Sequence, residues 1–143
     1  MRLPDINLWL ALVFEAHVHH PAAVRWFESL EPEGAVFCRF TQQGFLRLAT
    51  NAKVFDSDAL TLEGAWSAYD TLLGDERVAF VVEPPGLEIA WREHTASQSY
   101  SHRVWSDAYL AAFSRTAGLE LVSFDKGFHR YASARLRVTL LPA

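Results

Sequence analysis

Residues 107–125, which read DAYLAAFSRTAGLELVSFD, decide the fold. The segment from Asp107 to Phe113 is strongly helical, and the helix should stop at Gly118 because glycine is favoured just beyond a helix end. Residues 119–124 form an apolar run typical of a buried strand, and Asp125 follows that strand directly. A helix that leads straight into a buried strand indicates one unit of a parallel α/β sheet.

The same alternation of helix and strand runs through the rest of the chain. We expect further strands in a short stub ahead of Asp5 and over residues 35–38, 77–82 and 136–141. We expect further helices over residues 7–15, 21–27, 41–49, 61–73 and 87–94, with Thr41 as the N-cap of the third. This pattern implies a central, mainly parallel sheet covered by helices on both faces. Because there is no internal repeat or long linker, we expect one domain over residues 1–143.

The composition is that of a compact domain in water. Half of the 143 residues are hydrophobic, which is enough for a sizeable core. No apolar run reaches the roughly 18 residues that a membrane-spanning helix needs. The N-terminal residues reach an acid, Asp5, before an apolar stretch is established, which is unlike a secretory signal. We therefore expect a cytoplasmic protein that does not associate with membranes.

The net charge of -4 argues at first against a polyanionic partner such as nucleic acid. The charge is unevenly distributed, however, because residues 54–93 hold nine acids and two bases whereas residues 94–143 hold six bases and three acids. Two of those three acids, Asp107 and Asp125, are candidate metal ligands, so a bound divalent ion would make that region still more positive. A protein with a negative net charge can therefore still have a basic surface that binds nucleic acid.

Three aspartates occupy comparable positions at the ends of predicted elements. Asp5 follows the first strand, Asp107 opens the helix over residues 107–117, and Asp125 follows the next strand. In open α/β sheets ligands bind in the crevice beyond the carboxyl ends of the strands, so these carboxylates can converge there. Converging carboxylates repel one another unless a cation lies between them, and Mg²⁺ prefers oxygen ligands. Such a site can polarise a phosphoryl oxygen and help to generate hydroxide for in-line attack.

Several segments, in order along nearly the whole chain, resemble the VapC group of PIN-domain toxins. They are Pro4-Asp5-Ile6-Asn7 with Leu10-Ala11, residues 17–26, Arg39-Phe40-Thr41-Gln42-Gln43-Gly44-Phe45-Leu46-Arg47-Leu48, Ser106-Asp107-Ala108-Tyr109-Leu110-Ala111-Ala112 and Ser123-Phe124-Asp125-Lys126-Gly127-Phe128. The first and last segments are the most specific, and residues 52–100 resemble the family less. The resemblance implies a PIN-like three-layer α/β/α fold.

The resemblance also implies an activity, a cofactor and partners. It implies an endoribonuclease, a hydrolase of RNA phosphodiester bonds that depends on Mg²⁺ or Mn²⁺ and leaves 5′-phosphate and 3′-hydroxyl ends. The enzyme would be the toxin of a toxin–antitoxin pair, neutralised by a cognate antitoxin, usually a homodimer, and typically active on structured RNA such as transfer RNA. Asp5, Asp107 and Asp125 would be the catalytic, metal-binding acids, supported by hydrogen bonds from Asn7 and Ser123.

The chain departs from the family pattern at one position. PIN domains commonly place a further acid on the helix after the second strand, where this sequence reads Thr41-Gln42-Gln43-Gly44. A glutamine offers a neutral carbonyl oxygen, which lacks the Coulomb attraction of a carboxylate for a metal ion. We therefore expect weak metal binding, completed by the RNA phosphate, with Gln42 or Gln43 as supporting residues and Glu15 or Glu83 as conceivable substitutes.

Basic residues flank the motif segments and are candidates for phosphate contacts. Lys126 and Arg130 are favoured because they follow Asp125 closely, and Arg103 is a further candidate. The other candidates, for which an ordinary solvated charge is as good an interpretation, are Arg39, Arg47 and Lys53.

The histidines allow two other chemistries. His17, His19 and His20 are good ligand types for zinc, but no second Cys or His cluster completes a site, which favours a structural role. A ribonuclease without metal could use His102 and His129 as general acid and base, although surface histidines are the simpler interpretation.

Two alternatives from other classes remain open. A degenerate PIN-like module could bind RNA or a partner protein without cleavage, which the missing fourth acid would explain. A receiver-like signalling domain needs an acidic pair after the first strand, and Asp5-Ile6-Asn7 supplies one acid only.

Overall fold

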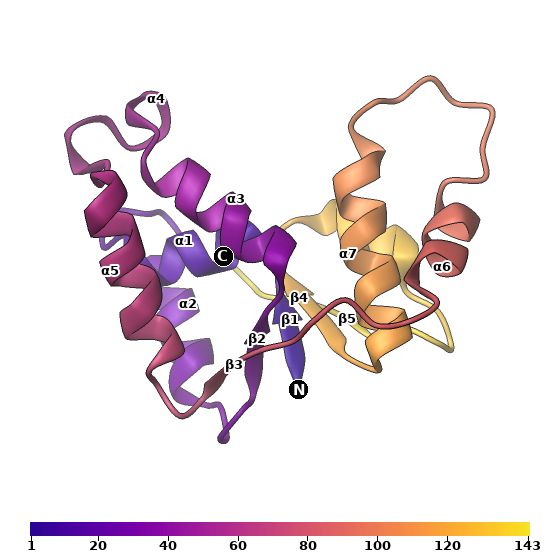
Figure 1. The fold of residues 1–143 in the computed structure, drawn as a ribbon, viewed down its shortest axis with the longest axis horizontal. Coiled ribbons are helices and arrows are strands. Elements are labelled where there is room, and N and C mark those ends of the chain that lie inside the picture. Colours follow the sequence, from indigo (N-terminus) through magenta and orange to yellow (C-terminus); the bar gives the residue numbers. More distant parts are fainter.

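The computed structural model describes all residues 1–143 and has one sheet of five strands in the order β3-β2-β1-β4-β5 (Figure 1). The strands are β1 (Arg2–Pro4), β2 (Ala35–Phe37), β3 (Val78–Phe80), β4 (Glu120–Ser123) and β5 (Val138–Leu140). All four neighbouring pairs are parallel, which confirms the predicted mainly parallel sheet.

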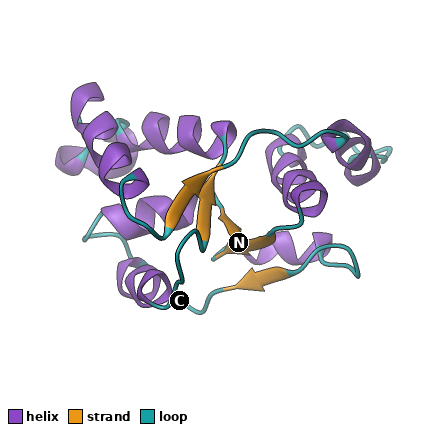
Figure 2. Cartoon of the chain, turned by 60° about the horizontal axis from the view of Figure 1, so that its bottom comes forward, coloured by secondary structure: helices purple, strands orange, loops and turns teal.

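Helices cover both faces of this sheet (Figure 2). The α-helices are α1 (Ile6–Val13), α2 (His20–Glu28), α3 (Arg39–Ala49), α4 (Ala52–Phe55), α5 (Leu62–Leu73), α6 (Leu87–His94) and α7 (Val104–Ala117). Two 3-10 helices, η1 (Asp56–Asp58) and η2 (Lys126–Tyr131), complete the chain. No helix combines the length and the apolar character needed to cross a membrane.

The core has one hydrophobic layer on each side of the sheet. On one side Leu3 and Leu121 pack with α6, α7 and η2, and on the other Phe37 packs with α1, α3 and α5. The inner strand β2 is apolar and fully buried, because a strand inside a parallel sheet is covered on both faces. Trp9 stacks on Phe37, with ring centroids 3.9 Å apart, and this pair fixes α1 against the sheet.

The order in which strands are added to the sheet reverses at β1. It runs from β1 outward through β2 to β3, and then returns to place β4 on the other side of β1. Leu3 pairs in register with Leu121, and the backbone N–H of Asp5 donates to the carbonyl of Val122 at 3.0 Å. The carboxyl ends of β1 and β4 therefore lie side by side at a topological switch point, where α/β sheets bind ligands.

The sequence predictions fail at two helix starts. Thr41 is not an N-cap, because α3 begins at Arg39 and Cys38 is its N-cap, with Thr41 one turn later in a reciprocal capping box. Asp107 does not open its helix, because α7 begins three residues earlier, at Val104. Both errors arise because a polar residue in the first turn and a true N-cap leave the same local signal.

Candidate active site

Three aspartates from separate segments line one cleft at the carboxyl ends of β1 and β4. Asp5, Asp107 and Asp125 surround a space of about 220 Å³. The remaining lining residues are Ile6, Asn7, Phe40, Arg47, Leu48, Ser106, Leu110 and Phe128. The predicted convergence of the three acids is thus the arrangement in the structure, and Asn7 lies with them.

Asp5 is the buried member of the three, with 5% of its surface exposed. One carboxylate oxygen, Oδ1, accepts from the backbone N–H of Leu8 at 2.9 Å and caps α1, while Oδ2 accepts from the hydroxyl of Ser123. Burial, with a smaller contribution from the charges of Asp125 and Asp107, raises the pKa of Asp5 from 3.8 to about 6 against these hydrogen bonds. A positive charge in the cleft would reverse this effect and favour the carboxylate.

Ser123, the last residue of β4, connects two of the three acids. Its hydroxyl donates to Asp5 and accepts from the backbone N–H of Asp125 at 2.8 Å. The side chain is fully buried, so both bonds form away from water. Ser123 therefore orients Asp5 and fixes the backbone at Asp125, as a supporting residue should.

Asp107 and Asp125 are more accessible than Asp5. Asp107 is partly buried in the first turn of α7, where burial and the charge of Asp125 raise its pKa and Arg130 opposes the rise. Asp125 is exposed and caps η2, since its Oδ1 accepts from the backbone N–H of Gly127 at 2.8 Å. One exposed and one partly exposed carboxylate next to a buried one leave room for water and substrate.

The three carboxylates fit a divalent cation that keeps part of its water shell. They share one cleft and act on one another's pKa, as like charges at one site do. No group of three or more His, Cys, Asp or Glu side chains is arranged to hold an ion by direct ligation alone. Mg²⁺ is usually held by one or two carboxylates, waters and substrate phosphates, so an all-carboxylate cleft suits it better than it suits zinc, which favours Cys and His ligands.

Neither glutamine of α3 lines the cleft. Gln42 is buried and its Oε1 accepts from Nη1 of Arg39 at 2.5 Å, whereas Gln43 is exposed to solvent. Glu15 and Glu83 also lie outside the cleft lining, and Glu83 accepts from the hydroxyl of Tyr109 at 2.8 Å. No residue therefore takes the place of the fourth acid.

None of the basic candidates Lys126, Arg130 and Arg103 lines the cleft. Lys126 lines a separate hollow with Phe124 and His129. Arg130 is near enough to Asp107 to act on its pKa, with its guanidinium over the Tyr131 ring at 4.9 Å. Arg103 is exposed just before α7. Their contacts with RNA stay predictions.

Sequence reasoning missed Ser106 and the α3 lining residues Phe40 and Leu48 as parts of the site, and it gave Arg47 only as one of several candidates for phosphate contacts. Ser106 precedes a predicted ligand, and this adjacency was an available signal. The α3 residues are seven and eight positions apart, which is the spacing of one helix face. That spacing could have identified them if the start of the helix had been known.

The histidine cluster at the start of α2, His17, His19 and His20, has structural contacts. The backbone N–H of His19 donates to Nδ1 of His17 at 3.1 Å, and Nδ1 of His20 lies 2.8 Å from the carbonyl oxygen of Ala11. The ring of His19 stacks on Phe124, with centroids 4.2 Å apart. The three histidine side chains are not arranged as a group that could hold an ion by direct ligation alone.

His102 and His129 are exposed, and neither lines the aspartate cleft. An acid–base pair that acts without metal at this cleft would have to reach it from outside.

Comparisons with known proteins agree with this geometry. The PIN domain family model matches residues 2–134. Ribonuclease VapC41 of Mycobacterium tuberculosis is 46% identical over 143 residues, which cover 96% of this chain and 98% of that protein. Ribonuclease VapC38 of the same organism is 32% identical over 142 residues, which cover 94% and 92%.

Two solved structures share the fold. Mycobacterium tuberculosis VapC20, described as a sarcin-ricin loop cleaving toxin, matches with a TM-score of 0.69 at 17% identity, over 99% of this chain and 100% of that one. FitAcB from Neisseria gonorrhoeae matches with a TM-score of 0.65 at 15% identity, over 97% and 96%. With the five parallel strands, these matches confirm the predicted three-layer α/β/α fold.

Proposed function

The chain belongs to the PIN-domain family, among the VapC ribonucleases, and we propose that it is a toxin endoribonuclease that hydrolyses RNA with a divalent metal ion. The ion would be Mg²⁺ or Mn²⁺, and the residues that would hold it are Asp5, Asp107 and Asp125. The observation that carries this proposal is the convergence of these carboxylates, from β1, α7 and the end of β4, on one cleft.

Each acid has a distinct part in this proposal. A divalent cation would neutralise charge on the phosphate and lower the pKa of an attacking water. Asp5, held by Leu8 N–H and the Ser123 hydroxyl, is the rigid member that fixes the position of the positive charge. Asp107 and Asp125 are reached by solvent, so they can accept hydrogen bonds from water near the RNA phosphate.

The partners follow from the VapC relationship. We infer that a cognate antitoxin neutralises the enzyme in the cytoplasm, that the active form is a homodimer and that residues 1–143 form a single domain. A structured RNA such as transfer RNA is the proposed substrate. Ser106 and Asn7, both exposed in the cleft, are available to hydrogen-bond to that RNA.

A second candidate function is RNA or protein binding without cleavage. The observation in its favour is that α3 brings no carboxylate into the cleft, so the site has one acid fewer than the common PIN pattern. Binding without cleavage would make the three acids dispensable for the biological effect.

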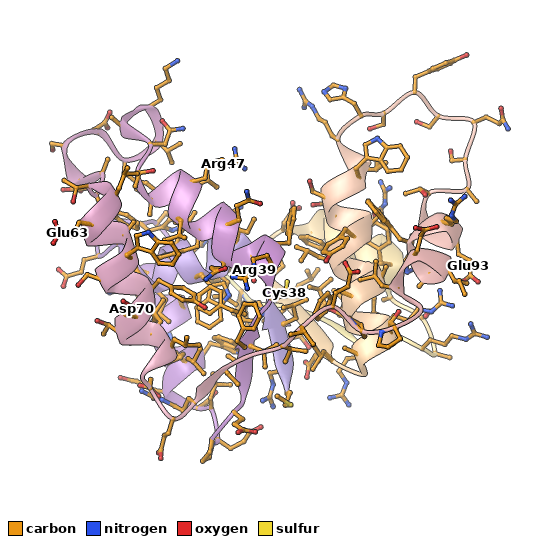
Figure 3. The ribbon with its side chains drawn as sticks, in the orientation of Figure 1. Cys38, Arg39, Arg47, Glu63, Asp70 and Glu93 are labelled. Atoms are coloured by element: carbon orange, nitrogen blue, oxygen red, sulfur yellow. The ribbon has the colours of Figure 1, made fainter.

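Digestion of total transfer RNA by the purified protein distinguishes the two. We expect cleavage with Mn²⁺ or Mg²⁺, none with chelator, and a loss of about 100-fold or more in Asp107→Asn, because electrostatic stabilisation at a reacting phosphate typically contributes that much. The control is Asp70→Asn, an exposed acid that does not line the cleft and that Figure 3 labels on α5. Binding of the RNA with no cleavage under any metal would support the second candidate.

A further inference from the structure

The α3 side of the cleft carries a cation opposite the three carboxylates. Phe40, Arg47 and Leu48 are the α3 residues in the lining, and Arg47 is the only Lys or Arg among all the lining residues. Figure 3 shows Arg47 projecting from the upper edge of α3, near the outer end of this helix. A cleft that is otherwise acidic therefore has one basic group at its border.

Close packing fixes this side of the cleft relative to Asp5. A Cβ atom at Gly44 would lie 2.1 Å from Cδ1 and 2.8 Å from Cγ1 of Ile6, the residue that follows Asp5. The absence of a side chain at Gly44 lets α3 approach α1 this closely. The contact between Gly44 and Ile6 therefore fixes α3 next to Asp5. Arg47 lies one turn further along α3, so the same contact sets its position.

The guanidinium of Arg47 has no partner within the protein. It forms no hydrogen bond and no ion pair, although three carboxylates line the same cleft. Most other arginines are engaged in ion pairs or a hydrogen bond, namely Arg2, Arg39, Arg77, Arg92, Arg115 and Arg137. Arg47 is therefore exposed and available to an anionic ligand.

We propose that Arg47 binds a phosphate of the RNA strand that lies in the cleft, adjacent to the phosphodiester that is cleaved. The inference rests on the proposed function, since RNA provides the phosphate. A guanidinium presents its donors in a planar fork that can hold two phosphate oxygens at once. RNA that approaches three carboxylates is repelled, and a cation at the border of the cleft offsets this repulsion.

The other basic residues are less suited to this contact. Lys126 opens onto a separate hollow, and Arg103 precedes α7 outside the cleft lining. Arg130 acts on the pKa of Asp107 from outside the lining. Arg47 is the one that shares the enclosed space with the acids.

The test uses the full chain in chelator, so that binding is measured without cleavage. A fluorescein-labelled 15-nucleotide single-stranded RNA is titrated at several salt concentrations with wild type, Arg47→Gln and Arg47→Lys. We expect Arg47→Gln to weaken binding about 10-fold or more, as the loss of a charge-assisted hydrogen bond does. We also expect the slope of log affinity against log salt to fall by about 0.7, which corresponds to one phosphate contact on a single strand. Arg47→Lys should keep most of that slope and lose part of the affinity.

Arg25→Gln is the matched control. Arg25 is also exposed, lies in the last turn of its helix and has no ion pair, but it is outside the cleft. Equal affinities and slopes for wild type and Arg47→Gln would overturn the inference, and so would equal losses in Arg47→Gln and Arg25→Gln. A wild type that cleaves no RNA would refute the proposed function, whereas the binding slopes would still decide the role of Arg47.

Discussion

At the scale of single residues, Asp5 combines burial with two hydrogen bonds and two nearby acids. Its pKa of about 6 lies above the ordinary value of 3.8, because burial penalises the carboxylate more than Leu8 N–H and Ser123 stabilise it. A bound cation needs the carboxylate form of Asp5, and burial in the folded protein disfavours that form. Metal binding and protonation must compete at this side chain.

This competition predicts a pH dependence. Mn²⁺ affinity should fall about tenfold for each pH unit below about 6, since the cation then has to displace a proton from Asp5. Calorimetric titration of Mn²⁺ at pH 5, 6, 7 and 8 measures this. An affinity that stays constant between pH 5 and pH 7 would contradict the role given to Asp5.

The raised pKa of Asp5 also predicts how the stability of the metal-free protein depends on pH. The folded state holds the Asp5 proton more tightly than the unfolded state, so Asp5 favours folding below pH 4 and this advantage is lost as pH rises through about 6. The gap between 3.8 and about 6 corresponds to about 3 kcal/mol, at about 1.4 kcal/mol per pH unit. Urea unfolding of wild type and Asp5→Asn in chelator should show the wild type gaining relative stability from pH 7 to pH 4. No relative gain would show that Asp5 is not buried as described.

Two buried serines provide a matched test of the link between the acids. Ser123→Ala should lower the free energy of unfolding by about 1–3 kcal/mol, because it leaves a buried oxygen of Asp5 without its donor. Ser114 is equally buried, but its hydroxyl has no hydrogen-bond partner, so Ser114→Ala should be close to neutral. Chemical denaturation measures both, and equal losses would show that the Ser123 hydroxyl has no special role.

At the scale of elements, the helix α3 decides which side chains face the cleft. Gly44 lets this helix pack on Ile6, and Phe40, Arg47 and Leu48 then border the acids while Gln42 is buried on another face. A rotation of α3 by one residue position, about 100°, would exchange these faces.

This packing predicts a coupled pair of substitutions. Gly44→Ala should destabilise the protein by about 1–3 kcal/mol, because the new Cβ overlaps the Ile6 side chain. In an Ile6→Ala background the overlap is gone, and Gly44→Ala should then stabilise by up to about 1 kcal/mol through its helix propensity. A double-mutant cycle of thermal unfolding measures this coupling, and additive effects of the two changes would rule out the contact.

The elements also show how far the sequence is predictive. The bounds of α6 match the prediction and α5 starts only one residue later than predicted, because Thr61, Gly74 and the break at Pro84-Pro85-Gly86 are strong local signals. The convergence of Asp5 and Asp125 was predictable too, since both follow strands whose carboxyl ends meet at one edge of the sheet, and Asp107 was placed near them by the helix that leads into β4. The orientation of the α3 side chains was not predictable, because it depends on where the helix starts and on the contact of Gly44 with Ile6.

At the scale of the whole molecule, the cleft joins parts of the chain that are far apart in sequence. Asp5 follows the central strand β1, while Asp107 and Asp125 come from α7 and the end of β4, more than 100 residues later. Figure 1 shows α3 and α7 on either side of the sheet's upper end, above β1 and β4. A cation bound between these acids would therefore link the N-terminal and C-terminal thirds of the fold.

The most direct test of the central claim is a titration of the wild-type protein with Mn²⁺ in which RNA cleavage and metal binding are measured together. We expect cleavage to rise with the same dissociation constant that calorimetry gives, and we expect Asp5→Asn and Asp107→Asn to lose both while Asp70→Asn keeps both. Cleavage at the full rate in chelator, undiminished by the aspartate substitutions, would contradict a metal-dependent mechanism at these acids.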